Sequence, residues 1–235
     1  QQQGAFLPMA FLGGTALRFL YRINRFSEDL DFSLVGKSES FQLNGYLTRL
    51  ETDLSVEGYP TEIKVKTDRT VQSAFVRFPG LLYAVGLSQH ENEIISIKIE
   101  VDTNPPTGAG LEITTIRHYA TLRVQHHDQA SLLAGKMHAV LQRRFDKGRD
   151  MYDLLWYFSD HTWPSPNLVM LNNALAQTRW KGAKLTKDNW RAVLLEKLRT
   201  VQWDQIQIDV RPFVERTEMI QLLTLATFEN LLNET

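Results

Sequence analysis

The strongest constraint on the fold is a change of hydrophobic periodicity near residue 128. Before this point several short runs alternate apolar and polar residues, and the clearest of them is 93–102. From Gln129 onward the apolar residues recur at the spacing of amphipathic helices. The sequence therefore predicts an α+β protein, with an α/β domain at residues 1–127, a helical domain at 128–235 and the functional site in the cleft between them.

Turn residues divide both parts into short elements. A helix is predicted over Leu12–Arg22, opened by the turn Gly13-Gly14-Thr15, and Ser38 is a candidate N-cap for a second helix that ends before Gly58. Strands are predicted at 29–35, 62–65, 73–78, 81–87 and 93–102. In the second part, helices are predicted at 129–145, 148–160, 166–178, 187–200 and 212–233.

Composition limits the chemistry and the partners. The 235 residues contain no cysteine, which excludes disulfides, thiolate zinc sites and a cysteine nucleophile, fits a cytoplasmic protein and leaves oxygen-ligated metals open. With 26 Lys and Arg against 27 Asp and Glu, the formal charge of −1 gives no global attraction to nucleic acid or to anionic membranes. No run of 18 apolar residues is present, and the start lacks the basic region of a secretory signal, so we expect no membrane partner.

Two carboxylates lie on the predicted strand 29–35. Asp29 and Asp31 are two residues apart, so they face the same way and repel each other unless a cation lies between them. Magnesium with nucleotide phosphates is the usual solution, and phosphoryl-type transfer depends on this kind of charge neutralisation. Glu100 or Asp102, on the polar face of the strand 93–102, is a candidate third ligand, with Glu100 preferred. A solvated strand face is the alternative explanation for these acids.

A glycine turn precedes the carboxylate pair. Gly13 and Gly14 have no side chains, so backbone N–H groups of Gly13-Gly14-Thr15 can approach an anion, and the following helix directs its positive end to the same place. The pattern is neither a Walker A loop nor a Rossmann fingerprint. Alone, such a turn is more often a simple helix start. Together with the acidic strands it predicts a phosphate-binding site.

The two motifs closely resemble those of the AbiEii/MenT group of nucleotidyltransferase toxins, in the polymerase-β-like superfamily. The resemblance covers roughly residues 10–160 and rests on LGGTALRFLYRINRFSEDLDFSL and KMHAVLQRRFDKGRDMYDLLWYF. It implies that Gly14 and Thr15 meet a triphosphate, and that Asp29 and Asp31 bind the metal. It further implies that Lys136 holds phosphate, that Arg143 is the arginine of the motif and that Asp150 has a base or metal role. Residues 161–235 carry no motif that we can place.

The second motif also has a physical interpretation. Lys136, Arg143 and Lys147 lie seven and four residues apart, so they form a row of cations if one helix runs that far. Asp150 then starts another helix, where an acid complements the helix dipole. The alternative is a surface lysine and a helix-start acid without a role in binding. In the functional interpretation Lys136 contacts triphosphate oxygens, and Asp150 accepts a proton from the attacking hydroxyl or orients it.

The predicted activity is therefore Mg²⁺-dependent transfer of a nucleoside monophosphate from an NTP to an acceptor hydroxyl, with Mn²⁺ as a possible substitute ion. By the resemblance, the acceptor is tRNA or another RNA, the protein is the toxin of a toxin–antitoxin pair, and a cognate antitoxin is a partner. Two alternatives stay open. One keeps the chemistry but modifies a small molecule, such as an antibiotic, or a protein side chain. The other is a binding module for nucleotide or RNA without catalytic activity.

Overall fold

The computed structural model describes residues 4–36, 41–117 and 120–233. It divides into two compact units. One contains residues 1–16, 28–105 and 113–126, and the other contains 17–27, 106–112 and 127–235. The predicted domain boundary between residues 127 and 128 stays a prediction. Two segments that precede it, 17–27 and 106–112, belong to the same unit as the helices. We call the units the sheet unit and the helical unit.

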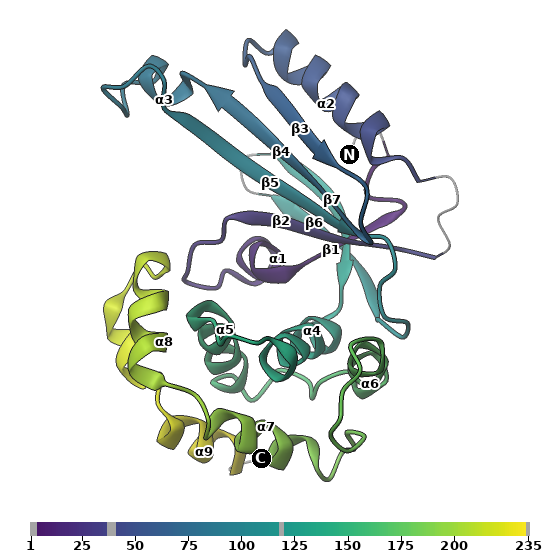
Figure 1. Cartoon of the computed structure of the whole chain (residues 1–235), viewed down its shortest axis with the longest axis vertical. Helices are drawn as coiled ribbons and strands as arrows, with labels where there is room; N and C mark the ends of the chain where they lie inside the picture. Colours follow the sequence, from purple (N-terminus) through teal and green to yellow (C-terminus); the bar gives the residue numbers. More distant parts are fainter. Residues whose placement is uncertain (1–3, 37–40, 118–119, 234–235) are drawn as a thin grey trace. The chain divides into compact units, whose positions relative to one another are not determined.

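A seven-stranded sheet forms the sheet unit, with the strand order β3-β4-β5-β2-β1-β7-β6 (Figure 1). The strands β2 and β5 are parallel, β1 is antiparallel to β2, and β4 is antiparallel to both β3 and β5. The bounds are β1 Met9–Leu12, β2 Asp29–Leu34, β3 Glu62–Lys66, β4 Val71–Pro79, β5 Ile94–Asp102, β6 Leu111–Arg117 and β7 Thr121–His127.

One face of this sheet packs on helix α2, Leu43–Val56 (Figure 1). The core between them contains Leu43 and Leu47 from α2 and Met9, Leu34, Ala74 and Val101 from the strands. Because side chains alternate along a strand, burial of Val101 and Leu34 on this face places Glu100 and Asp31 on the other. The division of the strand 93–102 into an apolar and a polar face is thus confirmed at its C-terminal end.

The helical unit is built from α-helices and two short 3₁₀ segments. Their bounds are α4 Gln129–Gln142, α5 Gly148–Phe158, α6 Leu168–Gln177, α7 Trp190–Leu198, α8 Trp203–Val210, η1 Arg211–Phe213, η2 Thr217–Leu222 and α9 Leu225–Asn233. Helix α4 begins at a true N-cap, because the Asp128 carboxylate accepts a hydrogen bond from the Ser131 N–H. None of the described helices has the length and hydrophobicity that crossing a bilayer requires.

Several predicted elements differ from the structure. The predicted strand 81–87 is wrong: after Gly80, whose φ is +67°, the chain makes the single-turn helix α3, Leu81–Ala84. Helix α2 begins at Leu43 with Gln42 at the N-cap position, and the predicted cap Ser38 lies outside the described residues. The predicted helix 212–233 is instead η1, η2 and α9, and Pro212 lies in the first of these.

Candidate functional site

The strand register places the predicted carboxylates in two adjacent rows of the sheet unit. Asp29 pairs with Lys98, and Asp31 pairs with Glu100, across the parallel strands β2 and β5. Paired residues of neighbouring strands point to the same face, and so do residues two apart on one strand. Asp29, Asp31, Lys98 and Glu100 therefore form a four-membered patch on the sheet face opposite α2. Each of the four is only partly exposed.

The glycine turn closes one side of this patch. Helix α1, Gly13–Tyr21, begins at the predicted turn, and Gly13 has a φ of +79°. A Cβ atom on Gly13 would lie 2.2 Å from the Asp31 Oδ2 atom, so only glycine allows the carboxylate to approach the helix start this closely. The Thr15 hydroxyl donates a hydrogen bond to the Asp29 carbonyl, which ties the first turn of α1 to β2.

The donor chemistry of the patch fits a magnesium ion that arrives with a nucleotide. Among the described residues, no three His, Asp or Glu side chains form a group that can hold a metal ion by themselves. Mg²⁺ commonly takes one or two carboxylates and completes its octahedron with water and substrate phosphates, so a full protein cage is not required. Asp31 in its glycine cradle, with Asp29 and Glu100 beside it, is a donor set of this kind.

Lys98 is a cation within the patch that sequence analysis did not single out. Its ammonium lies 2.8 Å from the Glu100 carboxylate. Burial by itself lowers the pKa of Lys98, but the hydrogen bond to Glu100 and the charges of Glu100, Asp29 and Asp31 outweigh burial and raise it. The carboxylates are thus partly neutralised by an internal cation. The alternating pattern of β5 contained this signal, because Lys98 shares the face of Glu100.

Asp102 occupies a different position from Glu100. It pairs with Ser33 rather than with an acidic residue of β2, and its carboxylate accepts a hydrogen bond from the Asn104 N–H. Burial raises the pKa of Asp102, and the hydrogen bond from Asn104 only partly opposes this. The register of the sheet therefore favours Glu100 as the carboxylate next to Asp31.

A second cluster of predicted site residues lies inside the helical unit. The Lys136 ammonium, on α4, is 3.1 Å from Asp150 Oδ1 and 2.7 Å from Asp153 Oδ2, both on α5. The Arg143 guanidinium is 2.5 Å from Asp150 Oδ2. The Arg25 guanidinium donates from Nε to Asp153 Oδ1 at 2.5 Å and from Nη2 to Asp153 Oδ2 at 2.6 Å. Three cations thus surround two carboxylates, so the cluster carries one surplus positive charge.

The charges in this cluster stabilise one another. Burial alone lowers the pKa of Lys136, but Asp153 and Asp150 outweigh it and raise the pKa. Burial alone raises the pKa of Asp150, but Lys136 and Arg143 outweigh it and lower the pKa below its ordinary value. Asp150 is therefore a carboxylate near neutral pH, and a weak base.

The condition for a row of cations on one helix is not met. Helix α4 ends at Gln142 and Arg143 has extended backbone angles, so Lys136, Arg143 and Lys147 do not share a helix. The ion pair between Arg25 and Asp153 adds two residues that the sequence motif did not single out. The i,i+3 spacing of Asp153 from Asp150 was the available signal, since both acids then face the same neighbour.

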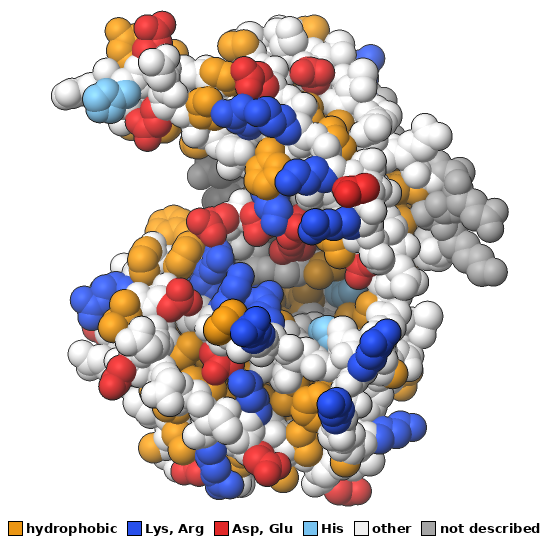
Figure 2. Space-filling view, in the orientation of Figure 1, with side chains coloured by type: hydrophobic (Ala, Val, Ile, Leu, Met, Phe, Trp, Pro, Cys, Tyr) orange, Lys and Arg blue, Asp and Glu red, His pale blue; other side chains and the backbone are white. Residues whose placement is uncertain are grey.

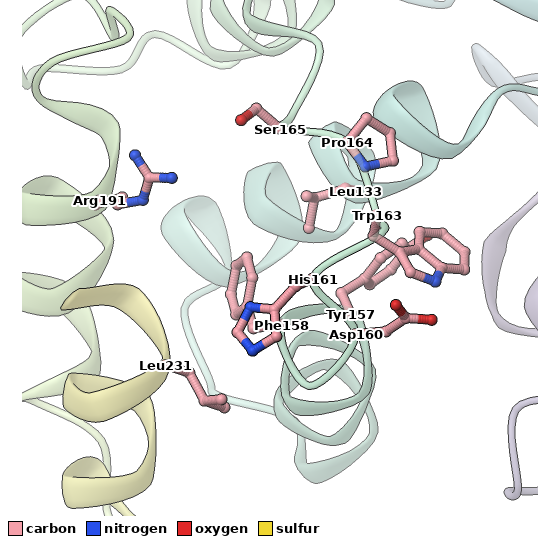
Figure 3. Close-up of a pocket in the computed structure, with 10 residues that line it drawn as sticks. All are labelled: Leu133, Tyr157, Phe158, Asp160, His161, Trp163, Pro164, Ser165, Arg191 and Leu231. Carbon is pink, nitrogen blue, oxygen red and sulfur yellow. The ribbon is translucent and has the colours of Figure 1, made fainter. Parts of the chain in front are cut away.

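The helical unit also contains a small pocket that none of the predicted site residues lines (Figure 3). Arg191 reaches from α7 toward the turn at 160–165, where His161 and Trp163 are found (Figure 3). The Tyr157 hydroxyl is buried without a hydrogen-bond partner among the described residues, and burial raises its pKa well above the ordinary value. The Trp163 ring packs edge-on against Tyr157, at a centroid distance of 4.5 Å. These contacts are consistent with packing of the unit.

The fold and the sequence were compared with known proteins. A search of curated protein sequences finds no match. The structure is similar to MenT4, a nucleotidyltransferase toxin from Mycobacterium tuberculosis H37Rv, with a TM-score of 0.57 and 17% identity over 97% of this chain and 76% of that chain. It is also similar to JHP933 from Helicobacter pylori, with a TM-score of 0.54 and 18% identity over 97% of this chain and 84% of that one.

At these identities the two structures show a shared fold alone. The family model for the nucleotidyl transferase AbiEii toxin of type IV toxin–antitoxin systems matches residues 1–234. This match includes residues 161–234, in which the sequence offered no recognisable motif. The chain therefore belongs to the AbiEii family of nucleotidyltransferase toxins.

Proposed function

We propose that this protein transfers a nucleoside monophosphate from an NTP to a hydroxyl group of RNA, with tRNA as the expected acceptor. The acceptor oxygen forms a bond to the α-phosphorus, the bond from that phosphorus to the bridging oxygen of the β-phosphate breaks, pyrophosphate leaves, and the proton of the acceptor hydroxyl passes to solvent. The observation that carries the proposal is the patch in which Asp31 lies against Gly13 and pairs with Glu100. Its location beside a helix N-terminus suits a metal-bound triphosphate.

Asp29, Asp31 and Glu100 are the residues that would hold Mg²⁺, with Mn²⁺ as a substitute. The bound ion would neutralise charge on the phosphates. Gly14 and Thr15 would offer their backbone N–H groups to the triphosphate, because the first N–H groups of a helix have no partners within the helix. The Thr15 hydroxyl already donates to the Asp29 carbonyl, so we assign it to holding β2 beside the helix start rather than to donating to phosphate.

Lys136 and Arg143 are the proposed cations for the triphosphate oxygens. Both are paired with Asp150, which holds them in place before the nucleotide binds. The low pKa of Asp150 makes it a poor proton acceptor, so we favour a role in positioning Lys136 and orienting the acceptor hydroxyl. Family membership implies a cognate antitoxin as a partner, and toxicity would follow from blocking the RNA that is modified.

The test is incubation of the purified protein with Mg²⁺, each α-labelled NTP in turn and total tRNA, followed by measurement of label in RNA. Label should enter RNA with at least one NTP and disappear in Asp31→Asn and Lys136→Gln. Lys64→Gln serves as the control, because Lys64 is an exposed lysine of β3 far along the sheet from Asp31. Label in an added small molecule or protein but not in RNA would move the acceptor. No transfer under any condition would refute the proposal.

A further inference from the structure

The loop between α6 and α7 is rich in basic residues. Residues 161–187 contain no Asp or Glu. The last ten of them include four cations. We call residues 178–189 the basic loop. The cations are Arg179, Lys181, Lys184 and Lys187. Figure 2 shows separate Lys and Arg side chains, with few carboxylates, on the α6 side of the helical unit.

All four cations are exposed and available. Each belongs to the exposed class of residues. None of them forms an ion pair with any carboxylate that the structure describes, whereas Lys136, Arg143 and Lys197 of the same unit all do. Four exposed cations beside one acid, Asp188, create a local positive potential, and a polyanion can bind them without first displacing an ion-paired partner.

The backbone of the basic loop is held in place by the helical unit. The Trp180 indole N–H donates to the Ala183 carbonyl at 3.1 Å, and the indole covers Gly182 so closely that a Cβ there would lie 2.3 Å from the ring. Leu185 is buried, and its N–H and carbonyl both bond to the Asn172 side chain at 2.9 Å. An ordered loop loses little conformational entropy when it binds a ligand.

Arg179 has a backbone conformation that normally selects glycine. Its φ is +58°. The Arg179 N–H donates to the Ala176 carbonyl and the Trp180 N–H to the Leu175 carbonyl, which is the hydrogen-bond pattern of a Schellman motif at the end of α6. Glycine adopts this conformation without strain, while an arginine destabilises the folded chain. A strained arginine with no ion pair in the described part of the chain suggests a function for its side chain.

The basic loop begins next to the helix that carries Lys136. The Thr178 hydroxyl lies 3.0 Å from His138 Nε2 and 2.7 Å from Gln142 Nε2, and both of these residues belong to α4. Burial lowers the pKa of His138, and the nearby charge of Arg143 lowers it further. Arg143, the end of α4 and the basic loop are thus neighbours within one unit.

We propose that the basic loop is a docking surface for the phosphate backbone of the RNA acceptor. The inference rests on the proposed function, because it extends it from the reacting hydroxyl to the body of the acceptor. A protein partner would need exposed apolar anchors, but Leu185 is buried and Trp180 packs on the loop itself. Charge without apolar anchors suits a polyanion that is bound through phosphates.

Arg179→Gly separates binding from folding, because the two effects have opposite signs. Removing the strained side chain should raise the thermal unfolding midpoint by about 2–4 °C. The loss of one phosphate contact should weaken binding of a total tRNA pool about fivefold near 0.1 M salt. A purely structural arginine would give no loss of binding. Equal or tighter tRNA binding by Arg179→Gly would overturn the proposal.

A matched pair of double variants tests the surface as a whole. Lys181→Gln with Lys184→Gln should reduce the slope of log K against log salt by about 1.4 units, and Lys64→Gln with Lys66→Gln should leave it unchanged. Lys64 and Lys66 are exposed lysines of β3, so the charge removed is the same. Equal slopes for both doubles would overturn the proposal. The proposal would also be overturned if Lys181→Gln with Lys184→Gln lost binding to polyglutamate but kept binding to tRNA, because this would indicate an acidic protein partner.

Nucleotidyl transfer is measured separately from binding. If the wild-type protein labels tRNA, and Lys181→Gln with Lys184→Gln binds and labels tRNA normally, the docking surface is overturned and the proposed function stays intact. If the wild-type protein labels no RNA, but the same double variant still loses affinity for tRNA, the proposed reaction is overturned and the docking surface stays intact.

Discussion

At the scale of single residues, Gly13 is the position where the backbone and the proposed site depend on each other most directly. In Gly13→Ala, a positive φ and a Cβ at 2.2 Å from Asp31 Oδ2 act together. The strain of the positive φ should destabilise the fold by about 1–2 kcal/mol, and displacement of Asp31 should abolish Mn²⁺ binding. Gly36→Ala is the control, because Gly36 has a φ of +77° and no atom within 4 Å of its Cβ position. If both variants lose only stability and keep Mn²⁺ affinity, Asp31 does not depend on Gly13.

Asp153 is the residue whose removal should affect folding most. It is fully buried and binds Arg25, which is 1% exposed, with both oxygens. Asp153→Asn leaves Arg25 without its carboxylate and should lower the free energy of unfolding by about 3–5 kcal/mol, measured by urea denaturation. The control is Asp53→Asn, which breaks an exposed i,i+4 pair with Arg49 and should cost about 0.5 kcal/mol or less. Similar values for the two variants would contradict this assignment.

The sequence predicts residues of the site where local geometry is sufficient. Asp29 and Asp31 share a strand face, and Gly13 opens a helix, so neither inference needs knowledge of distant contacts. The partner of Arg25 was not predictable in this way. Asp153 is 128 positions away, and only the packing of α5 brings the two together. Lys98 shares the strand face of Glu100, but its role as the counter-ion of the acids follows only from its contact with Glu100 in the structure.

At the scale of elements, the register of β2, β5, β4 and β3 makes a testable prediction about the metal. Lys98 lies in a row between Asp29 and Phe75, and Lys64 lies in the same row beyond Phe75. Because the Lys98 ammonium competes with an ion for Glu100, Lys98→Met should tighten Mn²⁺ binding about fivefold, measured by electron paramagnetic resonance of free Mn²⁺. Lys64→Met removes the same charge two strands away and should have little effect. Unchanged or weaker Mn²⁺ binding by Lys98→Met would show that Lys98 does not oppose the ion.

Prediction of elements succeeded where one period ran long enough and failed where tertiary contacts set the boundary. Helix α1 and strand β5 lie within about a residue of their predicted bounds. Helix α4 ends three residues before its predicted end, at Gln142, because Arg143 leaves helical geometry to reach Asp150. The next helix begins at Gly148, the residue predicted, and the lack of a side chain there also allows the backbone of α8 to pack closely. A single-sequence pattern does not contain the contact between Arg143 and Asp150 that ends α4.

At the scale of the whole molecule, the buried charge cluster should set how stability depends on pH. The pKa of Asp150 is below its ordinary value of 3.8, so the stabilisation that its charge provides is present above this value and is lost as pH falls through the lower folded pKa. The pKa of Lys136 is raised above 10.5, so its contribution is present below that value and is lost only in strong alkali. The protein should therefore be most stable across the neutral range and should unfold on the acid side first.

Asp150→Asn tests this dependence for the folded protein. It leaves Lys136 with one carboxylate and Arg143 with none, so it should lower the free energy of unfolding by about 2 kcal/mol at neutral pH. The difference from wild type should be constant between about pH 5 and pH 9, and should shrink as the pH falls below 3.8, where the Asp150 carboxylate of the unfolded chain takes up a proton. Urea denaturation at each pH measures both quantities. A difference that persists unchanged at pH 3 would mean that the lost shape and hydrogen bonds of Asp150, rather than its charge, account for its effect on stability.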